Sequence, residues 1–146
     1  MSRHLDDRQA AWELHVELAT RVAIAPLPPE QGLLSEALSS LECLTERTRQ
    51  ILREHGPHED TRGCRFQQLS RTVIDEVERP LLARWKPSVT AVCQDENLGA
   101  GVMDRERAWP DHVVLRDELA RMQSRLAVIA AELAELAGAR SLISEI

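Results

Sequence analysis

The side chains best suited to metal chemistry lie within one short stretch of the chain. His55 and His58 are followed by Cys64, and a distant Cys93 or His112 could complete a tetrahedral set of ligands. Zinc sites, however, usually show paired ligands at both ends with tighter spacing. The simpler interpretation makes His55 a cation at a helix C-terminus and His58 a solvated loop residue. His55, His58 and Cys64 are therefore weak metal candidates, and we expect no cofactor.

The sequence offers little support for an enzyme. Cys64 follows Gly63 just before a predicted helix, and a helix N-terminus can lower the pKa of a thiol. A cysteine hydrolase would also need a positioned histidine, which the sequence supplies only in principle. None of the 5 histidines has a glutamate three positions earlier, which excludes a di-iron bundle. Since the chain also has no nucleophile elbow and no phosphate-binding glycine loop, we predict no catalytic residue.

A cationic and aromatic segment lies near the middle of the chain. Arg84 and Lys86 flank Trp85, and Arg79 precedes them. Together they are a candidate surface for an anionic ligand or a protein partner. The competing interpretation is a solvated helix face, because opposite charges four positions apart, such as Asp75 and Arg79, support exposed helices. We expect each tryptophan of the chain to pack in the core and not at a binding interface.

The C-terminal residues, SLISEI, form a second candidate surface. They follow Gly138, which is well placed as a helix cap, and they include Leu142, Ile143 and Ile146. These apolar side chains have no obvious core to join. We expect the tail either to fold back onto the helices or to bind a partner.

Composition and charge narrow the class of protein. The chain has 146 residues, of which 43% are hydrophobic and 3% aromatic, and it is rich in helix-forming residues. A net charge of −6 argues against a nucleic-acid partner. There is no apolar run of about 18 residues and no signal peptide, so we expect no membrane partner. Three widely separated cysteines are typical of reduced thiols, which predicts a cytoplasmic protein.

Hydrophobic periodicity predicts one all-α domain spanning residues 1–146. Apolar residues recur every three or four positions over about 6–25, 33–55, 65–93 and 110–137. Prolines and glycines separate these runs, and the third run continues through Pro80 and Pro87, where we expect kinks. Similar helix lengths and modest loops favour an antiparallel, up-and-down four-helix bundle with a proline-kinked third helix.

The fourth run has the most regular stripe of apolar residues. Its members alternate four and three positions apart: Leu115, Leu119, Met122, Leu126, Ile129, Leu133 and Leu136. Such a stripe does not stay exposed to water, because each large apolar side chain gains about 1.5–3 kcal/mol on burial. It packs either inside the bundle or against another chain.

Three segments resemble a known family. They are EALSSLECLTERTRQILREHGP (36–57), VIDEVERPLLARWKP (73–87) and RAWPDHVVLRDELARMQSRLAVIAAELAELAG (107–138). Together they resemble a bacterial helical-bundle module of conflict or defence systems, of the caspase- and trypsin-associated (CATRA-like) kind. The resemblance covers most of the chain from Leu14 onward. It implies an interaction or adaptor module without an activity of its own, and it carries over no catalytic residue.

The chain departs from the pattern of that family at several positions. The family favours asparagine at Asp75, histidine at Lys86, and an aromatic residue near Glu42 and near Ile129. These departures weaken the transfer of any polar site.

Three functions follow from these observations. The first is a non-enzymatic protein–protein interaction module, acting as an adaptor or regulatory subunit. The second is a homo-oligomeric structural bundle with the Leu119, Leu126 and Leu133 stripe as its seam. The third and weakest is a metal- or ligand-binding helical protein that uses the connection at 55–64.

Overall fold

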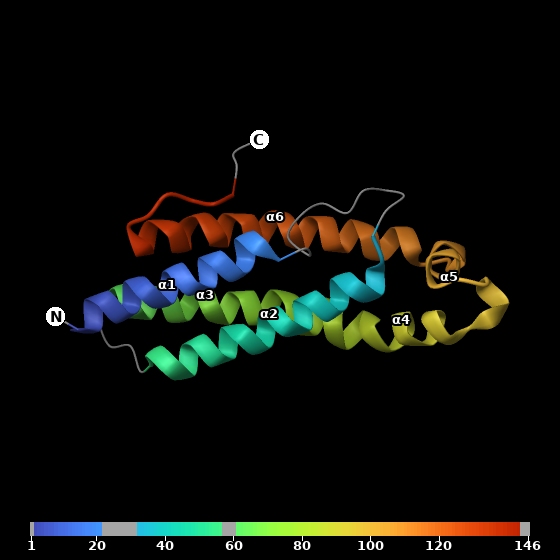
Figure 1. Cartoon of the computed structure of the whole chain (residues 1–146), viewed down its shortest axis with the longest axis horizontal. Coiled ribbons are helices and arrows are strands. Elements are labelled where there is room, and N and C mark those ends of the chain that lie inside the picture. Colours follow the sequence, from blue (N-terminus) through green and yellow to red (C-terminus); the bar gives the residue numbers. More distant parts are fainter. Residues whose placement is uncertain (1, 22–31, 57–60, 144–146) are drawn as a thin grey trace.

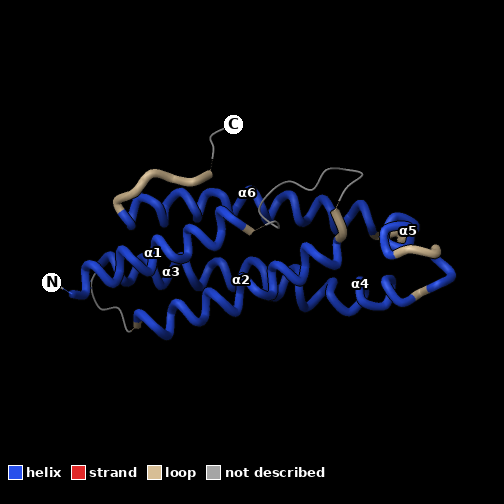
Figure 2. Tube along the Cα trace, viewed as in Figure 1, coloured by secondary structure: helices blue, strands red, loops and turns tan. Residues whose placement is uncertain are grey.

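The computed structural model describes residues 2–21, 32–56 and 61–143. Within these ranges there are helices and no strands (Figure 2), so the predicted all-α class is confirmed. None of these helices is both long and apolar enough to cross a membrane. In chain order the elements are α1 (Ser2–Thr20), α2 (Leu34–His55), α3 (Thr61–Val77), the π-helix η2 (Glu78–Ala83), α4 (Arg84–Gln94), the 3-10 turn η3 (Glu96–Leu98), α5 (Val102–Ala108) and α6 (His112–Ala137).

The long helices lie side by side along an elongated molecule (Figure 1). Helix α1 contacts α2, α3 and α6, while α6 also contacts α3 and α5. The short helix α5 lies across one end, where it packs against α4 and the start of α6 (Figure 1). This crossing helix brings polar side chains to the point where α2 begins.

The stripe on α6 faces the interior. Six of its seven members are buried, and Leu136 is partly buried against the same core. The stripe meets apolar residues from the other long helices, including Leu14, Leu41 and Val73, each of which has 0% exposed area. The stripe therefore belongs to the core of this chain. Its side chains pack inside the chain and are not free to pack against another one.

The third predicted helix is built from three consecutive elements. The α-helical geometry of α3 gives way to a π-helix that contains Pro80, and α4 then continues with Pro87 inside it. A proline cannot donate the backbone hydrogen bond of an α-helix, and a wider π turn is one way to accommodate that loss. Leu81 and Trp85 are buried like Val73 before them, so the apolar face keeps its phase.

Three local features differ from the expected boundaries. Helix α3 begins at Thr61 rather than 65, so Cys64 lies inside it and not before it. Helix α1 spans Ser2–Thr20 rather than 6–25, and residues 22–25 lie outside the described residues. The segment after α4 is partly helical, with η3 followed by α5. Asp95 caps η3, since its side chain accepts a 3.1 Å hydrogen bond from the Asn97 amide. Helix α5 has only seven residues, too few for a periodic apolar signal.

Candidate functional site

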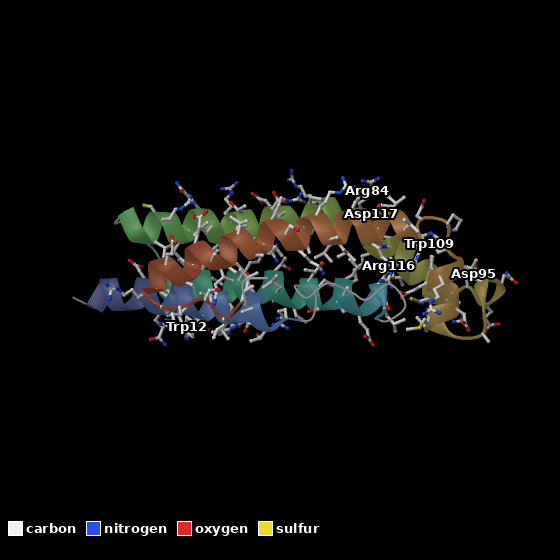
Figure 3. The ribbon with its side chains drawn as sticks, turned by 90° about the horizontal axis from the view of Figure 1, so that it is seen from above. Trp12, Arg84, Asp95, Trp109, Arg116 and Asp117 are labelled. Carbon is white, nitrogen blue, oxygen red and sulfur yellow. The ribbon has the colours of Figure 1, made fainter. Side chains whose placement is uncertain are left out.

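Trp85, the aromatic member of the predicted surface, is a core residue with 6% of its area exposed. Its indole N–H donates a 2.5 Å hydrogen bond to Glu118 on α6, and its ring lies edge-on to Trp109 at 5.7 Å. Arg84 covers the ring, with its guanidinium carbon 4.7 Å from the ring centre, and pairs with Glu118 at 3.0 Å. Arg84 and Trp109 both lie toward the end of the molecule that carries α5 (Figure 3). The interpretation of Trp85 as a core residue is confirmed.

The rest of this segment offers charge but little apolar surface. Lys86 forms an ion pair with Glu42 on α2, and Arg79 is exposed. Val89 and Val92 are buried, as Trp85 is. A partner that approached this segment would therefore meet basic side chains and no large apolar residue.

Of the three metal candidates, the two that the structure describes, His55 and Cys64, are not grouped as ligands of one ion. His58 lies outside the described residues, and Cys64 is exposed on α3. His55 instead contacts Glu13 on α1, with 2.9 Å between its Nε2 atom and Glu13 Oε2. In the described part of the chain, Glu13, Glu54 and His55 form the one group of three potential metal ligands.

The C-terminal tail folds back onto the helices as far as it is described. Leu142 is 54% exposed, Ile143 is partly buried against the core, and Ile146 lies outside the described residues. The backbone N–H of Leu142 donates a 3.0 Å hydrogen bond to Nε2 of His15. The tail is therefore attached to α1 through a side chain that the sequence analysis did not single out.

His15 joins three segments of the fold. It is fully buried, and its Nδ1 atom lies 2.7 Å from the carbonyl oxygen of Ala130 on α6. Because a carbonyl only accepts and a backbone amide only donates, the neutral ring must carry its hydrogen on Nδ1. Trp12 stacks on the ring at 5.4 Å. The imidazole thus forms one hydrogen bond with the Ala130 carbonyl of α6 and one with the Leu142 amide of the tail.

Glu106 on α5 is a charged residue with only 2% of its area exposed. Its carboxylate accepts hydrogen bonds from the backbone amides of Leu34 at 2.6 Å and Ser35 at 3.2 Å, and from the Ser35 hydroxyl at 2.9 Å. These amides belong to the first turn of α2, whose Leu33 cap has no polar side chain. Glu106 therefore supplies the acceptors that a helix N-terminus requires.

Cys93 lies beside this carboxylate but is not an activated nucleophile. Its Sγ atom is 3.7 Å from Glu106 Oε2. Burial raises the pKa of the Cys93 thiol above 9.0, and the charge and hydrogen bond of Glu106 also raise it, whereas Ser35 and Arg105 act in the opposite direction. A thiol is a weak nucleophile unless its pKa is lowered, so this cluster has the chemistry of a structural clamp.

Arg105 organises the loop between α4 and α5. Its guanidinium donates to the carbonyl oxygens of Cys93 at 2.6 Å, Gly99 at 2.8 Å and Ala100 at 3.3 Å. The Cys93 carbonyl belongs to the last turn of α4, where backbone acceptors lack helical partners. Arg105 therefore stabilises the end of α4, and its neighbour Glu106 stabilises the start of α2.

Arg116 and His112 form a related contact at the start of α6. Arg116 Nε donates a 2.8 Å hydrogen bond to His112 Nε2, and Arg116 Nη2 donates to the Gly32 carbonyl at 3.1 Å. Burial lowers the pKa of His112, and the positive charge of Arg116 lowers it further. The neutral imidazole is the form that can accept this hydrogen bond.

The outer side of α6 carries large apolar side chains that remain in solvent. Val113 is 63% exposed, Val114 is 45% exposed and Val128 is 62% exposed. Val113 and Val128 are separated by about four helical turns, which places them on the same side of the helix. We call Val113, Val114 and Val128 the outer valines.

The residues that sequence reasoning missed had weak local signals. His15 stands beside Leu14 and Leu18 on the apolar face of α1, where a polar residue suggests a buried hydrogen bond. Helix α2 begins without its own capping side chain, which signals an external acceptor but does not identify Glu106.

No protein-family model, curated protein or solved structure matches the chain. The resemblance to the CATRA-like module therefore stays a prediction. The function is inferred from the residues and their contacts.

Proposed function

We propose that this protein is a non-enzymatic interaction module, acting as an adaptor or regulatory subunit for another protein. Its polar cluster around Glu106 binds the chain's own backbone, and the Cys93 thiol has a raised pKa. Both features suit a structural role better than catalysis. The outer valines would form the surface that meets the partner.

The proposed architecture is an antiparallel, up-and-down four-helix bundle within a single domain. The contacts of α1 with α2, α3 and α6 support this arrangement, and so does the shared core. We further propose that η2 bends the third helix at Pro80, since interior prolines and π turns are common causes of bends. A bend there would close the bundle around the α6 stripe.

The observation that carries the functional proposal is the contrast between the two sides of α6. Its inner stripe is buried, yet Val113 and Val128 keep more than half of their area exposed. The two valines lie on the order of 20 Å apart along the helix, a length that one helix of a partner can cover. Exposed apolar side chains on one side of a helix are candidate anchors for an amphipathic helix of a partner.

The resemblance of segments 36–57, 73–87 and 107–138 to conflict-system modules supports a particular setting. We propose that the partner belongs to a bacterial defence or conflict system. A partner encoded beside this chain is the first candidate to test.

Site-specific photo-crosslinking in the native cell tests the proposal. A photoreactive residue at position 113 or 128 should form an adduct with the same protein, whereas the matched control at Ser39, an exposed residue of α2, should not. The purified partner should then bind the wild-type chain, and Val113→Glu with Val128→Glu should weaken binding at least tenfold. Since both valines are exposed, the double variant should keep the wild-type melting temperature.

Two results would contradict the proposal. One is that photoreactive residues at positions 113 and 128 form the same adducts as the control at Ser39. The other is unchanged affinity of the double variant for the purified partner. Adducts of the chain with itself would instead support the alternative of a homo-oligomer, with the outer valines as its seam.

A further inference from the structure

Three potential metal ligands converge where α1 lies beside the end of α2. Glu13 comes from α1, and Glu54 and His55 come from the last turn of α2. One ligand atom from each lies within 4.8 Å of the other two. The contact between His55 Nε2 and Glu13 Oε2 spans 2.9 Å, and these side chains are only 15% and 26% exposed. The imidazole and one carboxylate are thus already held together across the helix interface.

The spacing suits a divalent transition-metal ion. Nitrogen and oxygen ligands lie about 2.1 Å from zinc, so two ligands of one ion are about 3 to 3.5 Å apart. The separations here differ from that range by amounts that side-chain rotations can close. One imidazole and two carboxylates also supply the ligand types that zinc accepts, and two negative charges balance a divalent cation.

We propose that Glu13, Glu54 and His55 bind one zinc ion, with water at the fourth position, and that this ion links α1 to the C-terminal end of α2. This ligand set differs from the one expected from the sequence, because Cys64 is not part of it. The inference does not depend on the proposed interaction function.

Binding requires a modest rearrangement around Glu54. Its Oε1 atom accepts a 3.0 Å hydrogen bond from Gln50, and its Oε2 atom is 3.9 Å from Arg47 Nη1. Arg47 also lies 3.5 Å from Glu17, so that carboxylate can keep the guanidinium when Glu54 turns to the metal. His55 binds a metal ion as a neutral imidazole, through the lone pair of one ring nitrogen.

The test uses the purified full chain, freed of metal with a chelator and titrated with Zn²⁺ by isothermal calorimetry. We expect one ion per chain and a rise in melting temperature, because an ion bound only by the folded state stabilises it. Glu13→Gln, Glu54→Gln and His55→Asn should each weaken binding at least tenfold. Glu46→Gln, at another exposed glutamate of α2, and His112→Asn should bind as the wild type does.

A further variant separates this site from thiol binding. Cys64→Ser should leave zinc affinity unchanged. Loss of binding in Cys64→Ser with normal binding in Glu13→Gln would overturn the proposal, as would failure of the wild type to bind one ion. Glu54 is exposed, so Glu54→Gln should fold normally. This variant therefore still tests the site if Glu13→Gln or His55→Asn does not fold.

Discussion

The carboxylate of Glu106 accepts a 2.6 Å hydrogen bond from the backbone amide of Leu34, a residue 72 positions earlier in the chain. Leu34 is the first residue of α2, and no side chain at its own N-cap position makes a capping hydrogen bond. A negative charge at this end also interacts favourably with the helix dipole. The start of a long helix is therefore stabilised by a seven-residue helix from the other half of the sequence.

Removal of this carboxylate should destabilise the protein more than most single substitutions. Glu106→Ala leaves the amides of Leu34 and Ser35 without their acceptor, which should cost about 2–3 kcal/mol in the free energy of unfolding. Urea denaturation measures the loss, and hydrogen exchange should accelerate at these two amides first. Glu96→Gln, at an exposed glutamate of η3, is the control and should change stability by less than about 0.5 kcal/mol. Equal stability of the two variants would contradict this role.

The thiols should differ in their reactivity toward alkylating reagents. Burial raises the pKa of Cys93, whereas Cys43 lies exposed on α2. Because the thiolate is the reactive form, iodoacetamide at neutral pH should modify Cys43 well before Cys93. Mass spectrometry of a time course measures the order. Glu106→Gln should speed modification of Cys93, since it removes a negative charge that raises the pKa of this thiol. Modification of Cys93 ahead of Cys43 in the wild type would refute the prediction.

His112 should make the fold sensitive to mild acid. Its pKa is lowered from 6.5 in the folded state, so the unfolded chain binds the proton more tightly. The stabilising contribution of neutral His112 is complete above pH 6.5 and is lost as the pH falls through the folded pKa. In His112→Gln, the urea midpoint should therefore fall less between about pH 7.5 and about pH 5.5 than it does in the wild type. An identical fall in both proteins would show that His112 does not contribute.

His15 should hold the C-terminal tail in place. His15→Phe keeps a ring of similar size beside Trp12 but deletes the hydrogen bonds to Ala130 and Leu142. We expect a loss of about 1–3 kcal/mol in unfolding free energy, because a buried carbonyl loses its donor. Hydrogen exchange at the Leu142 amide should accelerate at least tenfold.

The control for the tail is Ser141→Ala, which removes only a local hydrogen bond to the Ile143 amide. It should leave exchange at Leu142 close to the wild-type rate. Wild-type exchange at Leu142 in His15→Phe would show that the tail is held by other contacts.

Local sequence pattern was enough to establish the helical class and the inner stripe of α6. Apolar residues repeating every three or four positions, such as Leu119, Met122 and Leu126, define one helix face whatever the rest of the chain does. Trp85 was favoured for the core by its type and was also a candidate for a partner-binding surface, and its 6% exposure supports the place in the core. Periodicity and residue type are properties of short segments, so they can be read without knowing how the segments pack.

Tertiary structure alone decided which polar groups meet. Glu106 reaches Leu34, and His15 reaches Leu142 across 127 positions, because helices that are distant in sequence lie side by side. His55 likewise meets Glu13 rather than Cys64, since the end of α2 lies beside α1. A hydrogen bond or a metal site depends on distances of a few ångströms between side chains, and the packing of the helices sets those distances.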